Sequence, residues 1–253
     1  MIIATWNVNS LRVRLEHLLN WLLTAKPDVV ALQETKLIDA DFPVAEITAA
    51  GYQVVFSGQK TYNGVALLSR FPISDVVTTV PNLEDPQRRI LAATINNVRI
   101  INLYVPNGSS VGSDKYIYKL DWLEKLTAFI QQQLTQHPQL VVLGDFNIAP
   151  EDRDVHDPKA WEGNVLVSEQ ERSALNTLMA HGLQDAFRLF EPAAGHYSWW
   201  DYRAAAFRRN MGLRIDHILL STALAVQCKE CIIDKTPRGW ERPSDHVPVM
   251  VKI

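Results

Sequence analysis

Several polar residues that could bind a metal or move a proton stand where apolar runs end. The run Leu140–Leu143 leads into Gly144, after which Asp145 and Asn147 follow two positions apart. Such a run is typical of a strand buried on both faces, and a period of two would direct both side chains the same way. A carboxylate and an amide that leave a buried strand together are suited to binding a ligand.

Other chemically capable residues share this placement: Asn7, Asn9, Glu34, Tyr104, Asp216, Asp245 and His246. Each alone could equally be a turn former, a surface charge or a core residue with a hydrated polar end. Asp216 differs, because it lies inside the apolar segment 214–220, where a carboxylate needs a partner or becomes neutral. His246 is a plausible partner for it.

The candidate ligands are carboxylate and amide oxygens, without a spaced pair of histidines. Hard oxygen ligands favour Mg²⁺ or Mn²⁺ over Zn²⁺. Such a metal, with a His–Asp pair, a water-holding Asp and phosphate donors from Tyr and Asn, is typical of phosphate-ester hydrolysis. The chain has no glycine-rich phosphate loop followed by lysine, which argues against nucleoside-triphosphate chemistry.

The elements that must position these residues follow a repeated plan. Leucines at helical spacing from Leu15 to Leu23 predict an amphipathic helix, which Pro27 ends before a buried strand at Asp28–Leu32 delivers Glu34. The same order recurs in a helix whose apolar face includes Ile117, Leu120, Leu123, Leu126, Ile130 and Leu134, followed by Pro138 and the strand 140–143. We therefore expect two similar halves whose strand ends meet.

Shorter apolar runs predict the remaining strands: Ile2–Trp6, Val54–Phe56, Gly64–Leu68, Ile90–Ile95, Val98–Tyr104, Ile215–Leu220, Val226–Ile233 and Val247–Ile253. Asn96 and Asn97 predict a hairpin, and Ser168 with Glu171 predicts a capping box that opens a helix. The strand at 226–233 would point Cys228 and Cys231 to opposite faces, so a structural role is expected for both. Strands joined by short turns favour mixed or antiparallel sheets with helices outside.

Composition and charge narrow the class of protein. The 253 residues are 47% hydrophobic with no linker-like tract, which predicts a single domain over 1–253. No apolar run approaches the ~18 residues of a membrane span and no secretory signal is evident, so no membrane partner and a cytoplasmic location are expected. The net charge of −3 argues only weakly against a nucleic-acid partner, because local charge can differ.

The loop 193–212 interleaves aromatic and arginine residues, among them Trp199, Arg203 and Arg209. Such side chains suit base stacking and phosphate contact. The alternative is a half-buried hydrophobic plug with solvated arginines.

Six sequence blocks, in order and spanning residues 5–250, resemble the endonuclease/exonuclease/phosphatase superfamily. They are Trp6–Arg12, Leu32–Lys36, Asn63–Leu67, Gly144–Ile148, Gly212–Asp216 and Ser244–His246. The pairing of Tyr197–Arg203 with Gly212–Asp216 is similar to the branch that contains exodeoxyribonuclease III and the apurinic/apyrimidinic endonucleases.

The resemblance implies an α/β fold, a four-layer αββα sandwich of two packed mixed β-sheets with helices outside. It implies that Glu34 binds the metal and that Asp145 handles the attacking water. Asn7, Asn9, Asn147, Asp245 and His246 complete the implied metal-site group. Tyr104 and His246 would contact the phosphate, Asn147 would help position the water, and Asp216 would orient His246. The implied DNA contacts are Trp199 as a wedge, with Lys36, Arg88, Arg89, Arg203 and Arg209 on the backbone.

The predicted function is a Mg²⁺- or Mn²⁺-dependent DNA repair nuclease, a monomer acting in base excision repair at abasic sites and 3′ ends of double-stranded DNA. One alternative is a phosphatase of the same superfamily acting on inositol phosphates or phospholipid head groups. Another is an inactive module that binds DNA ends. Residues 161–171 depart from the family pattern where Leu166 is bulky, which leaves the balance of abasic-site, 3′-exonuclease and 3′-phosphatase activities open.

Overall fold

Two six-stranded β-sheets pack against each other in the computed structural model, which describes residues 1–253. The first sheet has the order β11 (Glu230–Ile233), β12 (Val249–Lys252), β1 (Ile2–Asn7), β2 (Val29–Gln33), β4 (Val65–Ser69) and β3 (Gln53–Ser57). The second has the order β5 (Ile73–Val77), β6 (Ile90–Ile95), β7 (Val98–Tyr104), β8 (Leu140–Asp145), β10 (Asp216–Ser221) and β9 (Leu183–Asp185).

Both sheets use the same pairing pattern. Each has one central parallel pair, β1–β2 or β7–β8, flanked by antiparallel neighbours. A parallel pair needs a crossover, which α1 (Leu11–Ala25) supplies in the first sheet and α3 (Asp114–Gln136) in the second. The two similar halves predicted from the repeated helix, proline and strand are therefore confirmed.

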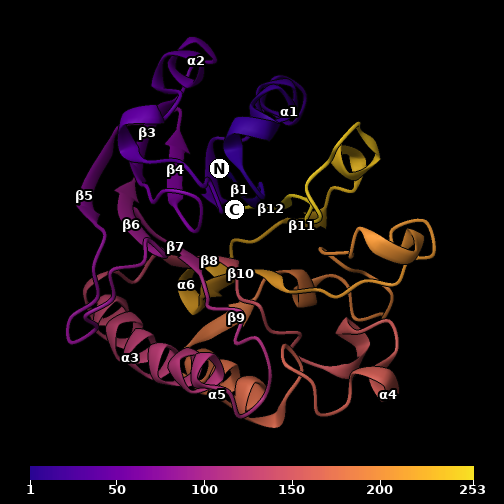
Figure 1. Ribbon diagram of the computed structural model, residues 1–253. Coiled ribbons are helices and arrows are strands. Elements are labelled where there is room, and N and C mark those ends of the chain that lie inside the picture. Colours follow the sequence, from indigo (N-terminus) through magenta and orange to yellow (C-terminus); the bar gives the residue numbers. More distant parts are fainter.

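Helices cover the outer face of each sheet (Figure 1). α1 and α2 (Val44–Ala49) lie on one side, while α3 and α5 (Glu169–Met179) lie on the other. Trp21 and several leucines of α1 pack on the first sheet, and the apolar face of α3 packs on the second. The arrangement is the four-layer αββα sandwich that the family resemblance implied, and it confirms the mixed sheets with helices outside that the strand pattern predicted.

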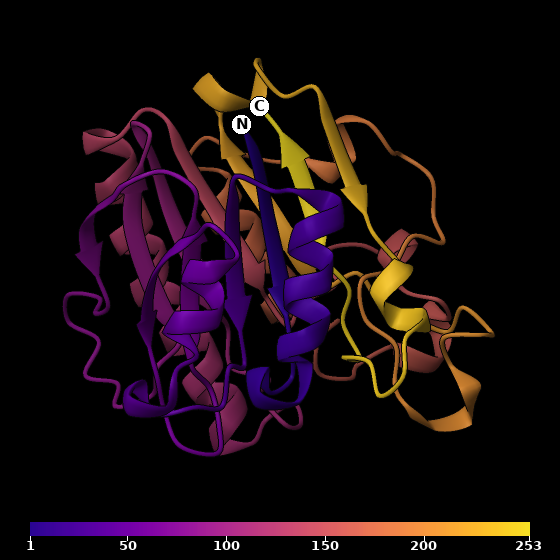
Figure 2. The ribbon, with the colours of Figure 1, turned by 90° about the horizontal axis from the view of Figure 1, so that it is seen from above.

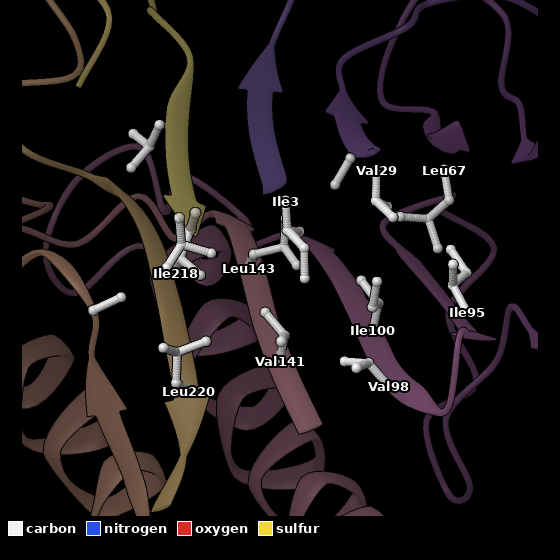
Figure 3. Packing of buried hydrophobic residues seen from close by; sticks show 14 of the residues in the cluster. Ile3, Val29, Leu67, Ile95, Val98, Ile100, Val141, Leu143, Ile218 and Leu220 are labelled. Carbon is white, nitrogen blue, oxygen red and sulfur yellow. The ribbon is translucent and has the colours of Figure 1, made fainter. Parts of the chain in front are cut away.

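The innermost layer is a cluster of 20 buried residues between the two sheets. Figure 3 shows Ile3 of the first sheet beside Leu143 of the second, and Val29 and Leu67 of the first sheet facing Ile100 and Ile95 of the second. Each fully buried aliphatic side chain of this kind contributes about 1.5–3 kcal/mol. This contact fixes the two sheets relative to each other and therefore fixes the relative positions of their strand ends.

The two chain termini lie together at one edge of the sandwich (Figures 1 and 2). The Met1 amino group donates to the Ile253 carbonyl at 2.5 Å. β1, β2, β7 and β8 run away from that edge, so their carboxyl ends meet at the opposite one. The remaining short helices, α4 (Pro158–Trp161) and α6 (Thr222–Ala225), and the 3₁₀ turns η1 (Asp39–Asp41), η2 (Asp152–Asp154), η3 (Phe187–Leu189), η4 (Arg203–Ala205) and η5 (Thr236–Gly239), lie in connections.

The predicted strand at Val226–Ile233 is wrong in its first half. Residues 222–225 form α6, Val226 is 80% exposed, and extended structure begins only at Glu230, so Cys228 lies before the strand. The physical reason is topological: β10 belongs to one sheet and β11 to the other, so the connection must leave the first sheet. Both cysteines are free thiols. None of the helices has the length and hydropathy needed to cross a bilayer.

Candidate active site

The carboxyl ends of β1, β2 and β8 bring Asn7, Glu34 and Asp145 into direct contact. The Asn7 Nδ2 amide donates to Glu34 Oε1 and to Asp145 Oδ2, both at 2.8 Å. Asn7 ends β1 and Glu34 follows β2 in the first sheet, whereas Asp145 ends β8 in the second. The Asn7 side chain thus links the two sheets at this edge. It is the amide nitrogen of Asn7 that faces the two carboxylates, whereas a metal ligand would have to offer the amide oxygen.

His246 pairs with Asp216 on the other side of Asp145. His246 Nδ1 lies 2.9 Å from Asp216 Oδ2, which also accepts from the Ser198 hydroxyl at 2.7 Å. The other ring nitrogen, Nε2, lies 3.7 Å from Asp145 Oδ2. The pairing expected from a buried carboxylate in an apolar strand is confirmed.

The buried charges perturb one another strongly. Burial raises the pKa of Asp145 to about 7, helped by Asp216 and Glu34 and opposed by His246. Burial would lower the pKa of His246, but the facing Asp216 and Asp145 carboxylates raise it to about 10. His246 is therefore a cation at neutral pH, while Asp145 lies near the pKa that suits proton exchange at that pH.

Lys36, Asn9 and Asp245 form the rim of the site beside Glu34. Lys36 Nζ lies 2.9 Å from Glu34 Oε2 and donates to Asn9 Oδ1 at 2.6 Å, and Asn9 Nδ2 donates to Asp245 Oδ1 at 2.9 Å. Burial would raise the pKa of Glu34, yet the adjacent Lys36 ammonium holds it below its usual value. Burial would also raise the pKa of Asp245, but His246 and the Trp199 indole lower it. The Glu34 and Asp245 carboxylates are therefore both ionised at neutral pH.

Asn147 is buried next to Asp145, and Asn107 lies beside it. The Asn147 backbone N–H donates to Asp145 Oδ1 at 2.9 Å, and Asn107 Nδ2 donates to Asn147 Oδ1 at 3.2 Å. Sequence reasoning missed Asn107, although it follows Tyr104 at the end of β7, and the repeated plan could have pointed to it. The Arg89 guanidinium covers the Tyr104 ring, 4.6 Å from its centroid.

Tyr104 stays protonated in this setting. Burial and the nearby Glu34 and Asp145 carboxylates raise its pKa well above the ordinary tyrosine value. Its hydroxyl is therefore available as a donor. Tyr104, Glu34, Asn107 and Arg89 line an open cavity of about 600 Å³, which gives solute access to the site.

Several of these residues have a left-handed backbone, which is uncommon for residues other than glycine. Their φ angles are 42° at Asn9, 51° at Glu34, 55° at Lys36 and 50° at Asn147. Hydrogen bonds hold these turns, such as Lys36 N–H to the Asn63 carbonyl at 2.9 Å. Strained backbone concentrated around one group of polar side chains is typical of a functional site.

The donor set fits a hard divalent cation. Glu34, Asp145 and His246 place a side-chain oxygen or nitrogen within 4.8 Å of one another, but the cationic His246 has no free ring nitrogen, so the two carboxylates are the candidate ligands and the implied ligand role of His246 is not supported. Two of the three are carboxylates whose mutual repulsion a cation would relieve, and the oxygen-rich set matches the preference of Mg²⁺ and Mn²⁺. Asn7, Asn9, Asn147 and Asp245 surround this group and hydrogen-bond its members or each other.

The aromatic loop is divided between core and rim. Tyr197 and Trp200 are buried with Val247, so that part is a hydrophobic plug, as in the alternative interpretation. Trp199 is half-buried at the rim, with its indole N–H donating to Asp245 Oδ2 at 3.0 Å. Arg203 is exposed and paired with Asp201, and Arg88 and Arg209 are exposed as well.

A buried ion cluster that sequence reasoning missed supports β10 from behind. Arg214 Nε lies 2.6 Å from Asp154 Oδ1, and its Nη2 lies 2.7 Å from Asp185 Oδ2. Arg188 also pairs with Asp154, and His217 joins Arg214 to the Ile148 carbonyl. The sequence offered one hint of this cluster, the position of Arg214 next to an apolar strand. Its partners Asp154 and Asp185 are distant in the sequence, so the pairing could not be predicted.

The fold and site together define a metal-assisted phosphoester hydrolase. The chain matches the model of the endonuclease/exonuclease/phosphatase family over residues 4–246, and it belongs to that family.

Its relatives act on DNA. The chain is 35% identical to exodeoxyribonuclease III of Haemophilus influenzae, over 97% of each chain. Among solved structures it resembles the 3′ phosphatase NExo from Neisseria, bound to a product DNA hairpin, with a TM-score of 0.99, 47% identity and coverage of 100% of this chain and 99% of that one. An AP endonuclease from Archaeoglobus fulgidus gives a TM-score of 0.97 and 39% identity with the same coverage. The predicted family and enzyme class are confirmed.

Proposed function

We propose that this protein is a Mg²⁺-dependent DNA repair nuclease that hydrolyses phosphodiesters at abasic sites and at 3′ ends of double-stranded DNA. The observation that carries the proposal is the contact of Glu34, Asn7 and Asp145 facing the His246–Asp216 pair. This group places carboxylates that can bind a hard metal ion, a candidate general base (Asp145) and a protonated histidine (His246) at one accessible edge of the sandwich. Mn²⁺ would serve in the same ligand set.

The proposed chemistry is in-line attack of water on the phosphorus. Asp145, with a pKa near neutrality, accepts the proton of that water, and Asn147 orients the water from the next turn. His246, kept cationic by Asp216, stabilises the negative charge that develops on the phosphate oxygens.

The remaining site residues bind and orient the phosphate. Protonated Tyr104 and the Asn107 amide donate hydrogen bonds to it. A metal bound at Glu34 and Asp145 would supply charge neutralisation for the phosphate, while the protonated His246 beside it would not be a ligand.

DNA binding is proposed to use the rim around this site. Lys36, Arg88, Arg89, Arg203 and Arg209 supply positive charge for backbone contacts, and Trp199 supplies an apolar surface against the duplex. Because Trp199 is tied to Asp245, it would press against the duplex as a fixed surface. A monomer, a single domain over 1–253 and a cytoplasmic location remain predictions of the same account.

The Neisseria relative is a 3′ phosphatase, and the Archaeoglobus fulgidus relative is an AP endonuclease. We propose that this chain has both activities. Leu166 is buried beside Trp199, Ala149 and Leu213, with a left-handed φ of 76°. A bulky side chain there would narrow the space next to the Trp199 surface, so the ratio of abasic-site to 3′-end activity would depend on it.

A fluorescently labelled duplex with one abasic site tests the proposal, assayed with Mg²⁺ and with EDTA. Cleavage should require the metal, and Asp145→Asn should reduce the rate by about 100-fold or more. The matched control is Asp121→Asn, which removes an exposed carboxylate of α3 paired only with Lys125. Absent or metal-independent cleavage by the wild-type protein would contradict the proposal.

A further inference from the structure

Lys119 is an ammonium group enclosed in the outer layer of the fold. It lies on α3 in line with the buried residues Tyr116, Trp122 and Leu123, and its side chain has no exposed area. A lysine in such a position is unusual unless every donor has a partner. The apolar face predicted for this helix is wrong at Ile117, which is 60% exposed, because the buried stripe runs through Lys119 instead.

All three Lys119 donors are satisfied. Nζ donates to the Asn147 carbonyl at 2.7 Å and to the Asn107 carbonyl at 3.1 Å, and it pairs with Glu171 Oε1 at 2.5 Å. The two carbonyls belong to the residues whose side chains meet in the active site. The next carbonyl along the chain, Ile148, has a partner of its own in His217. The Asn147 carbonyl therefore has its hydrogen bond from Lys119, and the neighbouring Ile148 carbonyl has a separate one from His217.

Glu171 anchors the ammonium from α5, which lies beside α3 (Figure 1). It is also fully enclosed, and its second oxygen accepts from the Ser168 hydroxyl at 2.6 Å in the predicted capping box, which is confirmed. Its first oxygen also accepts from the Leu166 N–H at 3.1 Å. The ion pair thus connects three loops: the one after β7, the one after β8 and the one that precedes α5.

We propose that Lys119, anchored by Glu171, is a positioning residue that sets Asn107 and Asn147 for the chemical step. The inference rests on the proposed nuclease function. The Asn147 backbone has a φ of 50°, and its side chain is shared between the Asn107 amide and the Val105 carbonyl, 3.0 Å away. Without the bridging ammonium, the two loops lose their common donor, and the asparagine pair loses its fixed separation. Displacing a reacting group by about 1 Å costs about 100-fold in rate.

The double variant Lys119→Met with Glu171→Gln tests this by removing both buried charges at similar side-chain volume. We expect the single-turnover cleavage rate constant to fall about 100-fold, while the duplex dissociation constant measured in Ca²⁺ changes less than about threefold. The side-chain amide signals of Asn107 and Asn147, observed by NMR in ¹⁵N-asparagine-labelled protein, should move. The control is Arg99→Met, a buried cation at the other end of β7 that pairs with Gln133. This variant should lower stability and leave the cleavage rate constant, the duplex dissociation constant and the asparagine signals unchanged.

A cleavage rate constant within threefold of wild type, or unmoved asparagine signals, would overturn the proposal. If the double variant does not fold, Glu171→Gln alone is judged by the same two criteria, with a smaller expected loss of about tenfold. The NMR measurement needs no DNA. It therefore decides the positioning role even if the wild-type protein does not cleave DNA, in which case the proposed function fails separately.

Discussion

Replacing Asp216 by Asn should convert the wild-type pH profile into one that declines above neutrality. The substitution keeps the shape and a hydrogen-bond acceptor for His246 Nδ1 but removes the charge 2.9 Å away. At an effective dielectric constant of about 20, that charge pair is worth about 6 kcal/mol. The elevation of the His246 pKa from 6.5 to about 10 corresponds to about 5 kcal/mol. Losing Asp216 is therefore enough to return the pKa to the neutral range.

The sign of the effect follows from the charge of the protonated form. A histidine with a pKa of about 10 is a cation throughout pH 6–9, whereas a histidine with a pKa near 7 is mostly neutral at pH 8.5. Because only about 3% of a histidine with a pKa near 7 is protonated at pH 8.5, we expect the cleavage rate of Asp216→Asn at that pH to be about 30-fold below wild type, with much of the loss recovered at pH 6.5.

Cleavage rates from pH 6 to 9.5 and the His246 pKa from NMR titration provide the two readouts. Asp185→Asn is the matched control, because it removes a largely buried carboxylate of the adjacent strand β9 that pairs with Arg214. Its profile should keep the wild-type shape. The reasoning is refuted if Asp216→Asn retains a His246 pKa above 9 or a flat profile to pH 9.

Three further predictions concern the metal, the fold and acid stability. Glu34→Ala should weaken Mn²⁺ binding, measured by electron paramagnetic resonance, and lower cleavage by about 100-fold or more; unchanged Mn²⁺ affinity would remove Glu34 from the ligand set. Gly144→Ala should cost about 3 kcal/mol in urea unfolding, because a Cβ would lie 1.9 Å from the Leu103 carbonyl oxygen at a φ of 144°; Gly239→Ala, with open space around it, should be neutral. Burial would raise the pKa of Asp154, but Arg214 and Arg188 hold it below its usual value. Its stabilisation is therefore present above about pH 4 and is lost as the pH falls through the lower folded-state pKa. Asp154→Asn should cost about 3–5 kcal/mol at pH 7 and flatten the pH dependence of the unfolding free energy below pH 4; an unchanged slope would contradict that assignment.

The strand ends were predictable because burial leaves a strong mark on sequence. The strand before Asp145 is apolar on both faces, and so is the strand before Glu34, so polar residues that follow them stand out. The pairing of Asp216 with His246 could also be predicted, because an ionisable group inside an apolar strand requires a nearby partner.

The supporting groups could not be predicted in the same way. A lysine on a helix is normally solvated, and nothing near Lys119 in the sequence indicates that Glu171 and two carbonyls enclose it. The contacts of Arg214 with Asp154 and Asp185 have the same character, since they depend on how distant segments pack. The route of 222–229 between the sheets was likewise hidden, because local apolar residues do not report which sheet the next strand will join.

The central claim, that this edge of the sandwich hydrolyses phosphate esters of DNA, is tested most directly by one comparison of initial rates. The substrates are duplexes with an abasic site, a 3′-phosphate and a plain 3′-hydroxyl end, together with an inositol phosphate, all in Mg²⁺. We predict turnover of the DNA substrates at rates at least about 100-fold above the inositol phosphate, all abolished by EDTA. Preference for the inositol phosphate, or DNA binding without cleavage of any duplex, would contradict the account.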